Sequence, residues 1–326
     1  RSHGTGLTLD KHAHGNNYSF FTMDVARRKL KKTSEPFFCY IHSNEPHHPY
    51  IPPISYQSEY IDEVEASVTE AIEFAATMSN ERWRWMAGGL PISDTEWEML
   101  YAMYDATIKY IDDCVGRFFD FVQRECGETI VIITSDHGEL FGEHGLLDHH
   151  SVLDDSLIHV PLITYGLSDV SDHTDQPTQH ADIMQTLLSS VGADTHQLEG
   201  YDIRDQQRSV AISQGVRSSV DDENEQNYQK ILQYNSDIDL SHLPESLATS
   251  ARTSDFKLVR TTERQRLYKL PDEQNDVKHQ FTSVFEDLST FLDSWTESQG
   301  ELSNYTTEDR ELNDEMKRHL HDMGYL

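Results

Sequence analysis

The sequence predicts an α/β fold in which helices flank a mostly parallel sheet. Three apolar runs have the length of buried strands and cover residues 36–42, 128–134 and 160–165. Helical patterns alternate with these runs, most clearly over residues 93–124 and 181–191. Strands and helices that alternate at this spacing are typical of α/β domains.

Further elements are expected on both sides of this alternation. A short helix is predicted over residues 20–32, and the acidic stretch 57–86 is predicted to be mostly helical. Ser93 and Glu96 have the spacing of a capping box, which predicts that the long helix begins there.

The pattern changes near residue 205. Short strands are predicted over residues 256–260 and 266–270, the acidic segment 221–247 is expected to be a loop, and the C-terminal end is expected to be helical. We therefore predict two domains, residues 1–205 and residues 206–326.

Charge limits the partners of the protein. The sequence has 26 basic and 57 acidic residues among 326, which gives a formal net charge of −31. A field of this sign repels nucleic acids and anionic membranes, so both are excluded as main partners. The acidic residues are spread along the chain, which we interpret as adaptation to high salt. The sequence gives no indication of the oligomeric state.

Hydropathy and cysteine content predict a cytoplasmic protein. No stretch approaches about 18 consecutive apolar residues, so no membrane-spanning helix is expected, and no signal peptide is recognised. Cys39, Cys114 and Cys126 have no metal-binding spacing, and this low, odd number fits a reducing compartment.

Asp136 and His137 directly follow the apolar run 128–134. Ligands of open α/β sheets bind beyond the carboxyl ends of the strands, so this pair is a candidate site for a divalent cation. A turn in which Asp136 caps the following backbone is the alternative that these two residues leave open.

Histidines gather in two further segments. His144, His149 and His150 lie in one loop, and His47 and His48 are flanked by prolines that restrict the backbone. Imidazole can stabilise an anion or transfer a proton, so both segments are candidates for catalysis. Because the chain has 18 histidines, a solvated loop with incidental histidines is the alternative for residues 142–150.

Together these segments resemble the sulfatases of the alkaline phosphatase superfamily. Residues 45–50 are similar to the family's Asp-Pro-His-x-Pro-Tyr, with Glu45 in place of Asp. Residues 135–139 and 142–145 match its Ser-Asp-His-Gly-Glu and Gly-Glu-His-Gly segments without change. The resemblance implies an alkaline-phosphatase-like mixed sheet flanked by helices, followed by a small C-terminal antiparallel-sheet subdomain.

The resemblance also implies roles for site residues. Asp136 and His137 would bind one divalent metal ion, Ca²⁺ by analogy with the family, with Mn²⁺ and Mg²⁺ as alternatives. His47 matches the catalytic histidine that contacts the sulfate or protonates the leaving oxygen. His149 is the second catalytic candidate, at a position where many members carry a lysine that holds the sulfuryl group.

Two more histidines are candidates for substrate binding. His48 is adjacent to His47 and could replace it, and His150 follows His149 in the histidine-rich loop. For His150, a packing role beside the site is the alternative.

One departure from the family pattern is large. Sulfatases make formylglycine from the first residue of a Cys/Ser-x-Pro-x-Arg motif, and an Asp-Asp pair near their start binds metal; neither occurs at the corresponding place here. We therefore expect this chain to be the C-terminal part of a sulfatase, either a fragment of a longer protein whose other part carries the formylglycine or the product of a truncated gene. By itself it is expected to bind metal weakly and to hydrolyse nothing.

The predicted function is metal-dependent hydrolysis of sulfate esters of small molecules or glycans. Hydrolysis of phosphodiesters or phosphonates and phosphoglycerol-type transfer remain alternatives within the superfamily. A non-catalytic domain that binds an anionic or glycan partner is the alternative from a different class.

Overall fold

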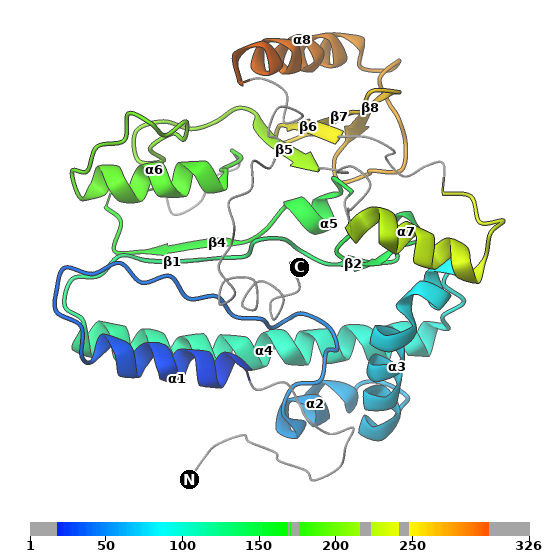
Figure 1. The fold of residues 1–326 in the computed structure, drawn as a ribbon, viewed down its shortest axis with the longest axis horizontal. Coiled ribbons are helices and arrows are strands. Elements are labelled where there is room, and N and C mark those ends of the chain that lie inside the picture. The colour runs from blue at the N-terminus through cyan, green and yellow to red at the C-terminus, as the bar shows by residue number, and fades with distance from the viewer. Residues whose placement is uncertain are drawn as a thin grey trace. The chain divides into compact units, whose positions relative to one another are not determined.

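The computed structural model describes residues 18–150, 152–168, 170, 176–215, 223–240 and 248–299 (Figure 1). The chain divides into two compact units. The first contains the N-terminal part to Thr129 together with residues 145–148 and 230–238. The second contains residues 130–144, 149–229 and 239–326. The predicted boundary at residue 205 stays a prediction. No helix in the described ranges combines the length and apolar character needed to cross a membrane.

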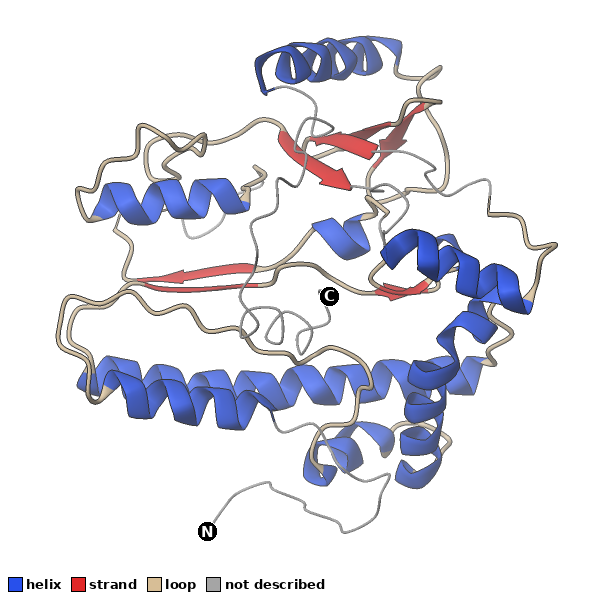
Figure 2. Cartoon of the chain, in the orientation of Figure 1, coloured by secondary structure: helices blue, strands red, loops and turns tan. Residues whose placement is uncertain are grey.

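Four helices build the first unit: α1 (Tyr18–Leu30), α2 (Ile54–Ile61), α3 (Val68–Ala87) and α4 (Asp94–Glu125). The long helix α4 packs against each of the other three (Figures 1 and 2). Its buried stripe repeats at the helical period and includes Leu100, Met103, Ala106, Tyr110 and Cys114.

Capping residues set where these helices begin. Ser93 Oγ accepts from the Glu96 N–H at 3.4 Å, while the Glu96 carboxylate accepts from the Ser93 N–H at 2.8 Å. This reciprocal pair is the predicted capping box, and it is confirmed. Ser67 and Glu70 form the same arrangement at the start of α3. Two orphan N–H groups are satisfied at each helix start.

The predicted buried strand at residues 36–42 is wrong, because this segment has no strand in the structure. Phe38 and Tyr40 are 74% and 76% exposed. An apolar run becomes a strand only where a neighbour satisfies its backbone N–H and C=O groups. In the described ranges, no strand pairs with residues 36–42.

A two-stranded ladder stands at the start of the second unit. β1 (Val131–Thr134) pairs with β4 (Leu162–Tyr165) in antiparallel register, with Val131 opposite Tyr165 and Thr134 opposite Leu162. The strands predicted over residues 128–134 and 160–165 are therefore present but shorter. Their pairing is antiparallel, whereas a mostly parallel sheet was expected. Neither strand is fully buried, and Ile163 is 58% exposed.

Short elements follow along the chain: β2 (Leu140–Phe141), the 3₁₀ turn Glu143–Gly145, β3 (Leu147–Asp148), α5 (Asp155–Ile158) and α6 (His180–Ser190). The predicted helix over residues 181–191 corresponds to α6. Helix α7 (Glu223–Tyr234) lies inside the acidic segment that was expected to be a loop, so that expectation is wrong. This stretch has two Glu and three Gln residues, which favour helix even when the net charge of the segment is high.

An antiparallel sheet forms the C-terminal region, as predicted. Its strands are β5 (Ala211–Gly215), β6 (Ala248–Arg252), β7 (Phe256–Arg260) and β8 (Gln265–Lys269), in the order β5-β6-β7-β8. Helix α8 (Thr282–Gln299) packs on β6 and β7 (Figure 1). The core between sheet and helix consists of Ala251, Leu258, Leu267, Leu288 and Leu292. The part of the expected helical C-terminal end that follows residue 299 lies outside the described residues.

Candidate functional site

The loop that carries His47 and His48 is tied to the start of helix α1. The Glu45 carboxylate is 3% exposed and accepts hydrogen bonds from the backbone N–H groups of Tyr18, at 2.8 Å, and Ser19, at 2.5 Å. It also accepts from Ser19 Oγ. Burial raises the pKa of Glu45, and these donors only partly oppose that effect. Glu45 thus caps α1 from a distant loop and fixes the backbone next to His47.

His47, His48 and Asp148 lie together in the first unit and are called the His47 group below. Their candidate ligand atoms all lie within 4.8 Å of one another. The two imidazole rings have centroids 4.2 Å apart, and His48 Nε2 lies 3.1 Å from Asp148 Oδ2. Histidines from one loop and a carboxylate about a hundred residues later in the sequence therefore meet at one point.

Hydrogen bonds orient both imidazoles. His47 Nδ1 lies 2.8 Å from the His48 carbonyl oxygen, which can only accept, so Nδ1 of a neutral His47 carries the proton and Nε2 has the lone pair. His48 Nδ1 lies 2.7 Å from Ser79 Oγ, which can either donate or accept. A hydrogen bond to Nδ1 thus orients each imidazole ring, as is typical of metal-ligating and catalytic histidines.

Asp148 is held in an unusual backbone conformation. Its φ is 74° and its side chain is 7% exposed. A non-glycine residue in the left-handed region costs conformational energy, and such residues cluster at functional sites. Arg82, on helix α3, places Nε 2.8 Å from Asp148 Oδ2, so one carboxylate oxygen serves both Arg82 and His48.

The second unit brings together three predicted site residues at the end of strand β1. His137 and His149 have ring centroids 4.6 Å apart. His137 Nε2 lies 4.0 Å from Asp136 Oδ2. His137 Nδ1 lies 2.7 Å from the Gly138 carbonyl oxygen, so Nε2 of the neutral ring has the lone pair. A carboxylate oxygen and an imidazole nitrogen therefore face the same region, and these donors fit a divalent cation.

Backbone packing fixes the turn that carries this pair. Gly138 N–H donates to the Leu157 carbonyl at 2.8 Å, and Glu139 N–H donates to the Ser156 carbonyl at 3.0 Å. A β-carbon on Gly138 would lie only 1.9 Å from the Ser156 carbonyl oxygen. Only glycine fits at this close approach.

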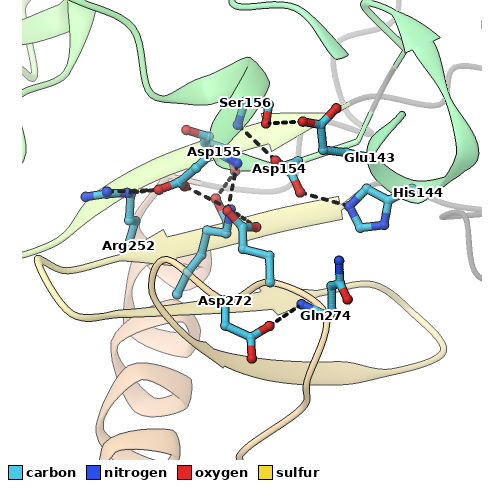
Figure 3. A network of polar contacts seen from close by, with 12 residues as sticks. Glu143, His144, Asp154, Asp155, Ser156, Arg252, Asp272 and Gln274 are labelled. Carbon is cyan, nitrogen blue, oxygen red and sulfur yellow. Dashed lines mark hydrogen bonds and ion pairs between the residues drawn. The ribbon is translucent and has the colours of Figure 1, made fainter. Parts of the chain in front are cut away.

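A polar network connects the histidine-rich loop to the start of α5 (Figure 3). His144 Nε2 lies 3.0 Å from Asp154 Oδ2, and Ser156 Oγ lies 3.2 Å from Glu143 Oε1. Asp155, the first residue of α5, pairs with Arg252 of β6 at 2.9 Å. The loop before His149 is thus linked through the start of α5 to the C-terminal sheet.

The remaining predicted residues have distinct surroundings. His150 is buried, with 3% of its surface exposed. Its predicted role in substrate binding stays a prediction, as do the roles of His47, His48, His149, Asp136 and His137.

Sequence reasoning missed Arg82, Ser79 and the role of Asp148. Asp148 stands in the histidine-rich loop, and its position between histidines was a signal that could have been used. Arg82 and Ser79 lie on a helix without a motif, so only the fold shows that they approach the His47 group.

Comparison with known proteins agrees with this architecture. The Sulfatase family pattern matches residues 7–193, more than half of the chain. The chain is 30% identical over 162 residues to the uncharacterized sulfatase YidJ of Escherichia coli (strain K12), covering 48% of this chain and 32% of that protein. It is 27% identical over 155 residues to human iduronate 2-sulfatase, covering 42% and 28%. The aligned part thus spans about a third of the length of these relatives.

Solved structures show the same fold. The phosphonate monoester hydrolase of Agrobacterium radiobacter matches with a TM-score of 0.62 at 20% identity, covering 85% of this chain and 60% of that one. The phosphonate monoester hydrolase SpPMH of Silicibacter pomeroyi matches with a TM-score of 0.61 at 18% identity, covering 87% and 60%. From the family match over residues 7–193, the chain belongs to the sulfatase family of the alkaline phosphatase superfamily.

Proposed function

We propose that this protein hydrolyses sulfate esters with the help of a divalent metal ion. The observation that carries the proposal is the meeting of His149 with His137, beside Asp136, at the end of strand β1. Cationic or hydrogen-bonding groups beside a metal ion are what a transferring sulfuryl group needs, because negative charge is spread over its oxygens.

Asp136 and His137 would hold the ion. One carboxylate oxygen and one imidazole nitrogen from this chain would be two of its ligands, and the ion would supply positive charge to a sulfuryl oxygen. The family resemblance favours Ca²⁺, while the imidazole donor also suits Mn²⁺.

The histidines would bind the ester and transfer a proton to its leaving oxygen. By the family resemblance, His149 stands where many sulfatases carry a lysine and others a histidine, and its imidazole would donate a hydrogen bond to a sulfuryl oxygen. His47 would act here as the imidazolium: the His48 carbonyl oxygen accepts from Nδ1–H at 2.8 Å, and Nε2–H would donate a hydrogen bond or its proton to the leaving oxygen.

The nucleophile is not identified in this chain, since no Cys/Ser-x-Pro-x-Arg motif occurs in the sequence. The test therefore uses the protein expressed from its complete gene, with the 326-residue chain assayed beside it. Hydrolysis of p-nitrophenyl sulfate is expected for the former, and no turnover for the latter.

Two variants and one control test the site. Asp136→Asn and His149→Ala are each expected to lower kcat/KM at least about 100-fold, the cost of removing one group that stabilises the transition state. His196→Ala is the matched control, because that imidazole is 68% exposed and pairs only locally with Asp194. Equal activity of Asp136→Asn and wild type would contradict the proposal. Faster turnover of a phosphonate monoester than of the sulfate ester would select the phosphonate alternative instead.

A further inference from the structure

The His47 group has the donor set of a transition-metal site. It offers imidazole nitrogens from His47 and His48 and one carboxylate oxygen from Asp148. Imidazole together with carboxylate suits Zn²⁺ and its neighbours, whereas Ca²⁺ and Mg²⁺ prefer all-oxygen sites. These ligands are different residues from Asp136 and His137, and the inference does not rest on the proposed hydrolysis.

The distances fit such an ion. Ligand atoms around a tetrahedral Zn²⁺ are about 3.4 Å apart, because each bond is about 2.0–2.1 Å long. His48 Nε2 and Asp148 Oδ2 are 3.1 Å apart, and the third ligand atom is within 4.8 Å of both. Small side-chain rotations are enough to complete the triangle.

Hydrogen bonding prepares the nitrogens for a metal. The His48 carbonyl oxygen holds the proton of His47 on Nδ1, so Nε2 of His47 is the ligand nitrogen. Ser79 Oγ, at 2.7 Å from His48 Nδ1, can accept from that nitrogen and leave Nε2 of His48 as the ligand. A metal ion between His48 and Asp148 would replace the proton that otherwise joins them.

The burial and the backbone conformation of Asp148 also favour a preformed metal site. Asp148 is 7% exposed and has a φ of 74°, a conformation that the surrounding structure must enforce. Arg82 opposes metal binding, because its Nε lies 2.8 Å from the same Asp148 oxygen. Its positive charge should weaken the affinity for a cation, although the contact also holds the carboxylate in place.

We propose that His47, His48 and Asp148 form a Zn²⁺-class metal site that is separate in its ligands from the Asp136 and His137 pair. The use of His47 Nε2 as a ligand would exclude its use as a proton donor at the same time. Zn²⁺ bound here would therefore inhibit any reaction in which His47 protonates the leaving oxygen.

Co²⁺ is the probe of choice, because its visible absorption reports nitrogen and oxygen ligands without any activity measurement. The full chain is titrated with Co²⁺ and then with Zn²⁺ in competition. We expect one Co²⁺ to give a four-coordinate spectrum that Zn²⁺ abolishes. His48→Ala and Asp148→Asn should each weaken binding at least about 100-fold.

Two further variants and one control keep the test informative if a variant that lacks a ligand folds poorly. Ser79→Ala removes only the partner of His48 Nδ1 and should weaken binding about 10–100-fold, while Ser58→Ala, whose hydroxyl bonds within its own helix, should have no effect. Arg82→Gln should strengthen binding at least about tenfold, because it removes a competing positive charge.

Two results would overturn the proposal. One is unchanged Co²⁺ affinity in folded His48→Ala and Asp148→Asn, with circular dichroism as the check on folding. The other is loss of the spectrum in Asp136→Asn together with its retention in His48→Ala, which would assign the ion to the pair after β1. The second result would support the metal-binding role proposed for Asp136 and His137, and hydrolysis is measured separately, so the two proposals fail independently.

Discussion

The ammonium nitrogen of Lys257 lies 2.9 Å from Oδ1 of Asp155, and the Lys257 side chain is 0% exposed. The same ammonium contacts a second carboxylate, that of Glu273. Burial raises the pKa of Glu273 despite Lys257, whereas the pKa of Asp155 is lowered because Arg252 and Lys257 outweigh the effect of burial. One buried cation thus joins strand β7 to the start of α5, which follows the loop that carries His149.

Lys257→Met should destabilise the protein by about 3–5 kcal/mol. The substitution keeps most of the side-chain volume but leaves Glu273 buried without its cation, and removal of one partner from a buried ion pair costs this much. Asp155 is affected less, because it keeps its bond from Arg252 at 2.9 Å. Chemical denaturation followed by circular dichroism measures the difference.

The double variant Lys257→Met, Glu273→Met is the control for this prediction. Replacing both members of a buried pair by apolar side chains should recover much of the loss. If the single variant unfolds at the wild-type denaturant concentration, the buried pair does not stabilise the native state. If the double variant is as unstable as the single one, lost packing is the cause and the electrostatic argument is wrong.

The contact between His144 and Asp154 predicts an acid-dependent loss of stability. Burial raises the pKa of Asp154, but hydrogen bonds from His144 and from the Ser156 N–H outweigh it and hold the pKa at about 2. Because the folded pKa lies below the unfolded value of 3.8, this group stabilises the fold above pH 3.8 and loses its contribution as the pH falls toward 2. The loss amounts to about 2 kcal/mol.

His144→Ala should remove part of this pH dependence. The difference in unfolding free energy between wild type and variant should shrink as the pH falls from about 5 toward 2, measured by urea denaturation across that range. His196→Ala is the matched control, because the His196 and Asp194 side chains are 68% and 73% exposed and solvent screens the pair. A difference that stays constant down to pH 2 would contradict the assignment.

The sequence predicts those parts of the fold whose signals come from residues close together in the chain. The capping box of Ser93 and Glu96 and the strand at Phe256–Arg260 depend on neighbours in sequence, and both were predicted correctly. The strand predicted over residues 36–42 was wrong, because an apolar run does not show whether a partner strand is present. Helix α7 was missed because its charge suggested a loop, although its residues favour helix.

The candidate site divides in the same way. Asp136 and His137 were found from a motif directly after an apolar run, and the structure places that pair at the end of β1. The contact of His48 with Asp148 spans about a hundred residues, and that of Arg82 with Asp148 starts from a helix without a motif. Only the packing of the helices brings these groups together, so no local pattern could show it.

Gly138→Ala tests the close approach after strand β1. A β-carbon there would lie 1.9 Å from the Ser156 carbonyl oxygen, so residues 154–157 must move. We expect a loss of several kcal/mol in unfolding free energy, because overpacking against backbone cannot be relieved by a side-chain rotation. Gly116→Ala is the matched control, since it lies inside helix α4 and a β-carbon there would meet no described atom beyond its own helix backbone within 4 Å.

The two glycines are predicted to respond in opposite directions. In a helix interior, alanine is better than glycine by about 1 kcal/mol, so Gly116→Ala should raise the melting temperature while Gly138→Ala lowers it. Equal melting temperatures for Gly138→Ala and wild type would mean that residues 154–157 are not held against the turn. In that case the His144 contact with Asp154 would lose its structural support as well.

Glu45 offers a test of the loop that carries His47. Glu45→Ala removes the acceptor of the Tyr18 and Ser19 N–H groups and should cost about 2 kcal/mol, because the start of helix α1 loses its cap. Glu45→Gln keeps one acceptor oxygen and removes a buried charge, so it should cost less than half as much. Thermal denaturation at neutral pH compares the three proteins.

The pH dependence supplies an independent check on Glu45. Burial raises the pKa of this carboxyl in the folded state, so its stabilising contribution is complete below the unfolded pKa and declines as the pH rises through the folded value. The wild type should therefore gain stability relative to Glu45→Gln as the pH falls toward 4.5. A gain in the opposite direction would show that Glu45 is stabilised as the carboxylate, and that the helix dipole and the N–H donors of α1 outweigh its burial.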